Sequence, residues 1–171
     1  LLREFRQTRL LAHPNIVRFY DLDCDRGTWF IAMELLNGEA LGQRLRRASP
    51  QGLPAREALR IAVACGEALA FAHEHGVTHG DVKPDNVFVT ATGEVRVLDF
   101  GVAPEPVLEP PPLDSTMVNL VTAAATRAYA SPEVLAGQRP EPRDDVFSLA
   151  CVIYEMLTGR HPYGRRGASE A

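Results

Sequence analysis

The single lysine of this chain, Lys83, lies in a segment suited to chemistry on phosphate groups. The segment runs from His79 to Asn86 with the sequence HGDVKPDN, and Asp99 opens a second short motif, DFG. Elsewhere the chain uses arginine for its cations, which indicates that position 83 needs a compact ammonium group. The planar fork of arginine would fit differently among phosphate oxygens and a carboxylate. We therefore interpret the two motifs as a phosphoryl-transfer site.

The side chains of these motifs match the needs of that reaction. A hydroxyl nucleophile needs an acceptor for its proton, and the Asp81 carboxylate can be that acceptor. Metal ions on a polyphosphate need hard oxygen ligands, which Asn86 and Asp99 can supply. Lys83 can neutralise charge on the transferred group. We therefore predict catalytic roles for Asp81, Lys83 and Asn86, and metal-binding roles for Asn86 and Asp99.

The composition is that of a single globular domain. The chain has 171 residues, 46% of them hydrophobic, which is enough for one core. A net charge of -4 favours neither a nucleic acid nor an anionic membrane as partner. We see no leader and no membrane-spanning run, so we expect a cytoplasmic protein. Cys24, Cys65 and Cys151 are far apart and read as packing residues.

Hydrophobic periodicity predicts the helices. An opening helix should end before His13, because Pro14 disfavours helical geometry in the residue before it. Gly76 is a stop signal for the longest predicted helix. His73 and His75 are interpreted as caps of that helix, without chemistry of their own. That helix covers residues 55–75, and two more are predicted at residues 40–47 and 144–157. The last is apolar almost all round and is therefore predicted to be a buried helix.

Aromatic and β-branched residues predict two antiparallel strand pairs. The predicted strands are residues 16–20 and 29–35, which form one pair, and residues 87–89 and 95–98, which form the other. Gly93 lies in the turn of the second pair, and Asp99 follows its end. The proline-dense residues 104–112 are predicted to be a loop.

In order and context these motifs resemble those of bacterial-type serine/threonine protein kinases. Residues 79–86 are similar to the catalytic loop, residues 99–101 to the magnesium motif, and residues 131–133 (SPE) to the end of the substrate loop. The run DVFSL from Asp145 resembles the start of the long buried helix of bacterial members. The resemblance covers nearly the whole chain. It implies ATP and Mg²⁺ as cofactors and a protein serine or threonine as the phosphoryl acceptor.

The resemblance also implies an α+β, protein kinase-like fold. Residues 1–36 would be a remnant of the small lobe, with helix C, strands 4 and 5 and the hinge, and residues 37–171 would be a large lobe truncated at its C-terminus. In such kinases a glycine-rich loop and a strand lysine precede helix C. We therefore expect this chain to be a fragment of the catalytic domain, with weak nucleotide binding and little activity alone.

Further nucleotide-binding residues are implied by the same resemblance. Glu4 is similar to the glutamate that pairs with the small-lobe lysine. The run Met33 to Leu36 resembles the hinge, where main-chain groups of Glu34 and Leu36 would bond the adenine edge and Met33 would guard the back pocket. Phe88 would pack beneath the purine. Lys83 and Asp99 would act at the phosphates.

Other residues would support the loops. Thr126 matches the threonine that bonds to the catalytic base and lysine. His79 and Phe100 would stack in the core, and Asp145 would bond the catalytic-loop backbone from below.

Two alternatives stay open. A His-Gly-Asp loop also occurs in kinases similar to the aminoglycoside and choline phosphotransferases, although Lys83 and residues 131–133 favour a protein substrate. The second alternative is a pseudokinase or truncated product that acts by binding. The presence of Asp81, Lys83, Asn86 and Asp99 argues against an inactive parent protein. Truncation, in contrast, argues for an inactive product.

Overall fold

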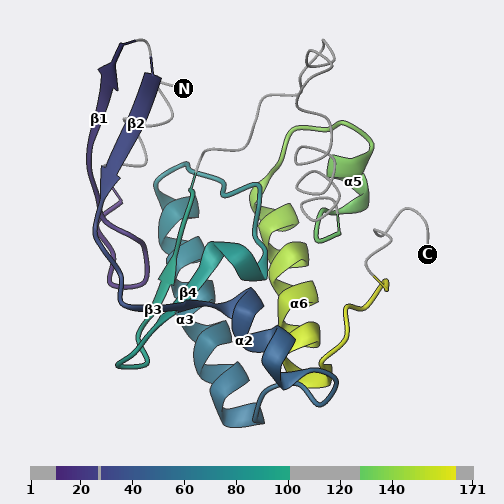
Figure 1. The fold of residues 1–171 in the computed structure, drawn as a ribbon. Helices are drawn as coiled ribbons and strands as arrows, with labels where there is room; N and C mark the ends of the chain where they lie inside the picture. Colours follow the sequence, from purple (N-terminus) through teal and green to yellow (C-terminus); the bar gives the residue numbers. More distant parts are fainter. Residues whose placement is uncertain (1–10, 27, 101–127, 165–171) are drawn as a thin grey trace.

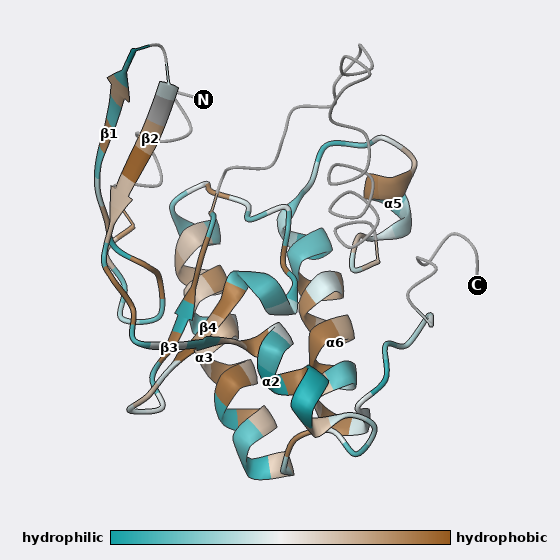
Figure 2. Cartoon of the chain, in the orientation of Figure 1, coloured by the Kyte–Doolittle hydropathy of each residue, from teal (hydrophilic) through white to brown (hydrophobic). Residues whose placement is uncertain are grey.

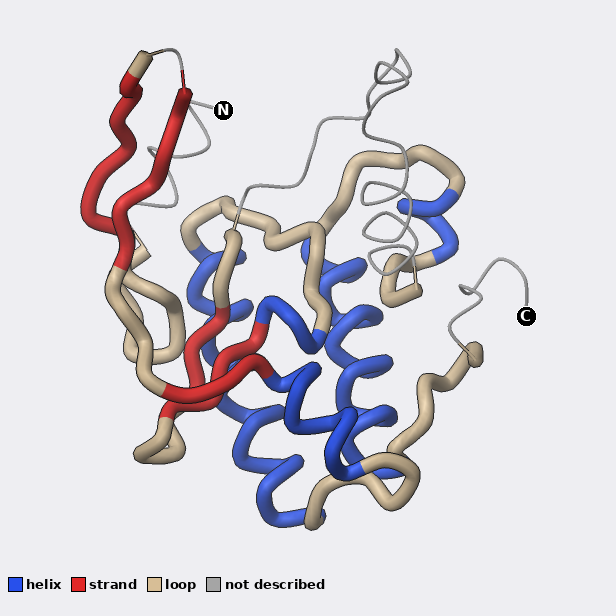
Figure 3. The backbone as a smooth tube through the Cα atoms, in the orientation of Figure 1, coloured by secondary structure: helices blue, strands red, loops and turns tan. Residues whose placement is uncertain are grey.

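The computed structural model of this protein describes residues 11–26, 28–100 and 128–164. The expected opening helix, the proline-dense stretch, Glu4 and Thr126 lie outside these residues. Figure 1 shows a strand hairpin, β1–β2, standing to one side of a group of helices, with strands β3 and β4 between them. Two separate groups of strands are visible in Figure 3.

The hairpin consists of β1 (Phe19–Asp25) and β2 (Thr28–Met33), which pair antiparallel. The predicted second strand is thus confirmed, but the bounds predicted for the first strand, residues 16–20, are wrong. The strand continues through alternating aspartates, Asp21, Asp23 and Asp25, whose exposed side chains do not interrupt the pairing. Alternate residues of a strand point to opposite faces, so a strand can continue through residues that place charged side chains on one face.

Residues before β1 instead contact the edge of a second group of strands. Ile16 forms a parallel bridge with Val97, and the Val17 amide donates to the Val97 carbonyl at 3.0 Å. Ile16 and Val17 are both buried, and Ile16 belongs to the main hydrophobic core rather than to the hairpin. This contact joins the start of the described chain to the body.

The second sheet has the order β3-β4-β5, with both pairs antiparallel. The predicted hairpin is confirmed as β4 (Val87–Thr90) and β5 (Val95–Val97), whereas β3 (Gly38–Ala40) was not predicted. A Cβ atom on Gly38 would lie 2.2 Å from the Val89 carbonyl oxygen, so only glycine allows this close pairing.

The predicted helices of the described region are confirmed as α2 (Leu41–Ala48), α3 (Ala55–Glu74) and α6 (Pro142–Thr158). A capping box of Glu141 and Asp144 begins α6, and Gly159 ends it at φ 68°. Two short turns were not predicted: the 3-10 turn η1 (Pro84–Asn86) and α5 (Pro132–Leu135). None of the described helices is long and apolar enough to span a bilayer.

The core lies between α3, α6 and the second sheet. Buried Ile61, Cys65 and Leu69 of α3 belong to the same cluster as Val152 and Met156 of α6. Hydrophobic and hydrophilic residues alternate along both helices in Figure 2, as expected for helices buried on one side. The prediction of a buried helix is therefore correct for only one side of α6: Cys151, Val152 and Met156 are buried, whereas Val146, Tyr154 and Leu157 are exposed.

Candidate active site

A buried carboxylate on α6 holds the backbone of the predicted catalytic loop. Asp145, only 1% exposed, accepts hydrogen bonds from the backbone amides of His79 and Gly80, both at 2.8 Å. Charge-assisted bonds of this kind are stronger than neutral ones. The prediction that Asp145 supports the loop from below is confirmed.

His73 adds a third contact to the same carboxylate. Its Nε2 atom lies 2.7 Å from Asp145 Oδ2, across the interface of α3 and α6. The sequence interpretation of His73 as a mere helix cap is therefore wrong. Its position four residues after buried Leu69 is the signal that could have placed it on the inner face of α3.

His79 is fully buried and fixes the loop from inside. Its Nδ1 atom accepts from the Asp81 amide at 3.2 Å, and its Nε2 atom donates to the Leu98 carbonyl at 2.8 Å. Burial lowers the pKa of His79 despite the nearby carboxylates, so the ring is neutral with its proton on Nε2. The ring centroid lies 4.7 Å from that of Phe100, which confirms their predicted packing, at a tilt of 54°.

The three predicted catalytic residues of the loop converge on one oxygen atom. Lys83 Nζ donates to Asp81 Oδ2 at 2.6 Å, and Asn86 Nδ2 donates to the same oxygen at 3.1 Å and to the Asp81 carbonyl at 2.9 Å. The η1 turn returns Asn86 to Asp81. The Asp81 side chain is 21% exposed, so a substrate can reach it.

Asn86 and Asp99 come from adjacent strand ends. The Leu98 amide donates to the Asn86 carbonyl at 2.8 Å, which ties the loop to the residue before Asp99. Because Asn86 Nδ2 is bonded to Asp81, its Oδ1 atom is the group suited to a metal. Asp99 is exposed and has a φ of 58°, a left-handed conformation that is uncommon for non-glycine residues and that recurs at functional sites.

These oxygens fit a magnesium ion only as a partial ligand set. Among the described residues, no group of three or more His, Cys, Asp or Glu side chains could hold a metal. Mg²⁺ commonly takes one or two carboxylates and completes its octahedron with waters and substrate phosphates. One carboxylate, Asp99, and one amide oxygen, of Asn86, are compatible with that mode of binding.

The predicted hinge follows β2. Met33, at its start, is exposed, and the Glu34 amide donates to the Arg18 carbonyl at 2.9 Å. The carbonyl of Glu34 is therefore the group left for an adenine edge. Leu36 is half-buried, and Phe88, opposite Ala40 across the β3–β4 pair, is half-buried as well.

The segment that begins at residue 128 is anchored on α6. Ser131 Oγ donates to Asp144 Oδ1 at 2.6 Å and caps α5 by accepting from the Val134 amide at 3.2 Å. The Tyr129 hydroxyl donates to the buried Glu155 carboxylate. Sequence reasoning missed these anchors, although a serine before proline at the first helical position is a known start signal.

Comparison with known proteins agrees with this geometry. The chain matches the family model for the protein kinase domain over residues 1–171. It is 37% identical over 166 residues to the serine/threonine-protein kinase PknB of Mycobacterium leprae, covering 94% of this chain and 25% of that protein. It is 36% identical over 170 residues to PknA of Mycobacterium tuberculosis, covering 96% of this chain and 38% of that protein.

A similar fold has been solved. The kinase domain of Mycobacterium tuberculosis PknI superimposes with a TM-score of 0.75 at 30% identity, covering 96% of this chain and 58% of that one. The chain thus spans only part of each relative. The predicted resemblance to bacterial serine/threonine kinases and the predicted α+β kinase-like fold are confirmed. This chain belongs to the protein kinase domain family.

Proposed function

We propose that this chain is part of the catalytic domain of an ATP-dependent serine/threonine protein kinase, which transfers the γ-phosphoryl group of ATP to a protein hydroxyl. The observation that carries the proposal is the convergence of Lys83 and Asn86 on Asp81 Oδ2 in a loop fixed by buried Asp145. Family membership supports the reaction class, since these relatives are named serine/threonine-protein kinases. We also propose that the small-lobe part ends near residue 36, where the hairpin gives way to β3 and α2.

Asp81 is the proposed base. Its Oδ2 atom accepts two side-chain hydrogen bonds, which fix the rotation of the carboxylate. The other oxygen, Oδ1, is then oriented to accept the proton of the substrate hydroxyl as that oxygen attacks the γ-phosphorus. Because the loop backbone is bonded to Asp145, little reorganisation is needed before reaction.

Lys83 is the proposed neutralising group. Its ammonium nitrogen lies 2.6 Å from Asp81 Oδ2, and the Lys83 side chain is 13% exposed, so it can bond Asp81 and still face an incoming phosphoryl group. A positive charge at this point stabilises the charge that spreads over the equatorial oxygens during transfer. The position of Thr126 in this contact remains a prediction, because it lies outside the described residues.

The nucleotide and Mg²⁺ are proposed to bind above this loop. Asn86 Oδ1 and the Asp99 carboxylate would hold the metal, which supplies charge neutralisation on the phosphates. Glu34 and Leu36 would present main-chain groups to the adenine, with Met33 and Phe88 beside the ring. Glu4 would act indirectly, by pairing with the small-lobe lysine that contacts the nucleotide.

Phosphorylation of substrates of two classes tests the proposal. The full-length protein is incubated with ATP and Mg²⁺ and either a mixture of serine- and threonine-containing peptides or an aminoglycoside. We expect phosphate on the peptides, whereas phosphate on the aminoglycoside alone would support a small-molecule phosphotransferase. Absence of transfer together with retained ATP binding would support a binding protein.

A metal-ligand variant tests the assignment of Asp99. Asp99→Asn keeps the size of the side chain but removes its charge, so nucleotide binding should need about tenfold more Mg²⁺. The dependence of nucleotide affinity on Mg²⁺ concentration is the measurement. Exposed Asp25→Asn, on β1, is the matched control and should bind as the unsubstituted protein does. Superimposable Mg²⁺ titrations for Asp99→Asn and the control would remove Asp99 from the metal site.

A further inference from the structure

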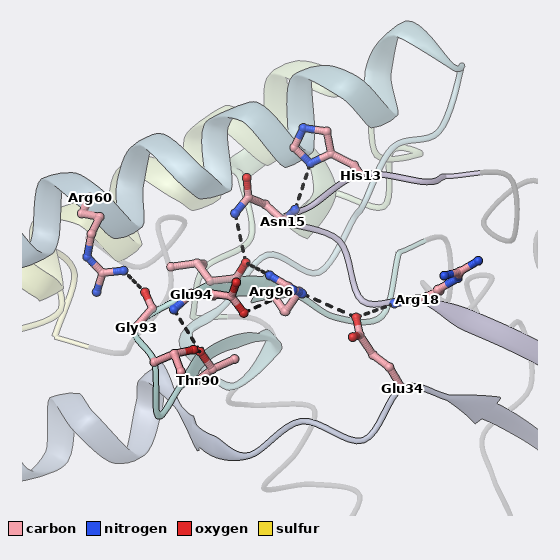
Figure 4. Close-up of polar contacts among 11 residues, drawn as sticks. His13, Asn15, Arg18, Glu34, Arg60, Thr90, Gly93, Glu94 and Arg96 are labelled. Atoms are coloured by element: carbon pink, nitrogen blue, oxygen red, sulfur yellow. Dashed lines mark hydrogen bonds and ion pairs between the residues drawn. The ribbon is translucent and has the colours of Figure 1, made fainter.

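Arg96 links the two strand groups of the molecule. It lies in β5, and its Nε atom is 3.5 Å from Glu34 Oε1, while its Nη2 atom is 3.4 Å from Glu94 Oε2. Figure 4 shows the guanidinium of Arg96 between these two carboxylates. One of them, Glu34, belongs to the proposed hinge, and the other lies beside Arg96 on its own hairpin. The contact with Glu34 therefore crosses from the large lobe to the hinge.

Glu34 is at the same time locked to the entry of β1. Its Oε1 atom accepts from the Arg18 amide at 2.9 Å, and its own amide donates to the Arg18 carbonyl at 2.9 Å. The residue before β1 and the residue after β2 are thus joined by two hydrogen bonds. One of these bonds depends on the position of the Glu34 side chain, which Arg96 contacts.

The same strand, β5, also holds the segment that leads into β1. The Val97 amide donates to the Asn15 carbonyl at 2.8 Å, and Asn15 Nδ2 donates to the Val95 carbonyl at 3.1 Å. Val95 and Val97 are buried, so Arg96 between them points to the opposite face of the strand, as alternation requires. Hydrogen bonds at the edge of β5 therefore hold the segment before β1, and the Arg96 side chain contacts the hinge at Glu34.

The solvent exposure of Arg96 and Glu34 sets the strength of their ion pair. Arg96 and Glu34 are 18% and 23% exposed, and both line a cavity of about 640 Å³ together with Arg18. Solvent screens pairs at this exposure, so the contact contributes modest energy. Its effect is on geometry, because a loosened hinge must be ordered when a ligand binds to its main chain.

We propose that Arg96 is a positioning residue for nucleotide binding, which acts by holding the Glu34 carboxylate and so the hinge main chain. This inference rests on the proposed kinase function. It separates Arg96 from the chemistry at Asp81, since Arg96 contacts the hinge and not the catalytic loop. Loss of Arg96 should therefore weaken nucleotide binding more than it slows phosphoryl transfer.

Hydrogen exchange in the full-length protein tests the contact directly. In Arg96→Gln, the amides of Arg18 and Glu34 should exchange about three- to tenfold faster than in the unsubstituted chain. Arg143→Gln is the matched control, because Arg143 forms an exposed ion pair with Glu141 at 3.1 Å, far from the hinge. Equal exchange of these two amides in the Arg96 and Arg143 variants would overturn the inference, whatever the protein catalyses.

Steady-state kinetics of the full-length protein test the consequence. Arg96→Gln should raise KM for ATP about three- to tenfold while kcat falls less than about twofold, and Arg96→Lys should recover most of the affinity. A fall in kcat at constant KM, or kinetics equal to those of Arg143→Gln, would overturn the inference alone. Absence of peptide phosphorylation by the unsubstituted protein would refute the proposed function and this inference with it.

Discussion

Removal of the buried carboxylate of Asp145 should be among the most destabilising single changes in this chain. Asp145→Ala leaves the amides of His79 and Gly80 and the Nε2 atom of His73 without their acceptor. A buried donor left without a partner costs about 1–3 kcal/mol. His79 is buried and Gly80 is partly buried, so we expect a loss of about 3–5 kcal/mol in the free energy of unfolding, a large share of the stability of a domain.

Urea unfolding, followed by circular dichroism, measures this loss. Asp85→Ala is the matched control, since its side chain is 56% exposed and its nearest cation, Arg46, is 3.9 Å away. The control should change stability by less than about 0.5 kcal/mol. Asp145→Asn should fall between the two variants, because its amide retains one acceptor oxygen. If Asp145→Ala lost no more stability than Asp85→Ala, the reasoning about the loop would be refuted.

Two further predictions concern cysteine reactivity and pH. Burial raises the pKa of Cys65 to about 12 and that of Cys151 to about 11, whereas Cys24 is exposed. At pH 8 a thiol reagent should therefore label Cys24 alone in the folded chain and all three cysteines in denaturant, and labelling of Cys65 in the folded chain would contradict the packing. Burial also lowers the pKa of His79 from its ordinary 6.5, so the unfolded state takes up the proton first as the pH falls. The contribution of His79 to the free energy of unfolding should be complete above pH 6.5 and should decline below it by up to about 1.4 kcal/mol per pH unit. His79→Asn should flatten this decline. Parallel plots of unfolding free energy against pH for the two proteins would show that His79 is not the cause.

The sequence predicted elements whose signals are local. The pattern from Ala55 onward and the stop signal at Gly76 were enough for α3, and the turn at Gly93 was enough for the β4–β5 hairpin. β1 was misplaced because its aspartates resemble a loop when taken one residue at a time. β3 was missed because three residues of low strand propensity form a strand only by pairing with β4.

The site was predictable where the residue types themselves carry the chemistry. Asp81, Lys83 and Asn86 lie within a few residues of one another, so their convergence follows from one short loop. The contacts of His73 with Asp145 and of Arg96 with Glu34 each join residues more than sixty positions apart in the chain. Nothing local in the sequence encodes such pairs, because they depend on how helices and strands pack.

The role of Asp81 as catalytic base is the central claim, and one variant tests it most directly. In the full-length protein, Asp81→Asn removes the proton acceptor but keeps an oxygen and an amide in its place. Peptide phosphorylation and nucleotide affinity are measured on the same preparation. We expect turnover to fall at least about 100-fold while nucleotide affinity stays within about twofold of the unsubstituted protein, because the proposed role of Asp81 is at the nucleophile and not at the nucleotide. Turnover of Asp81→Asn at the rate of the unsubstituted protein would contradict the account.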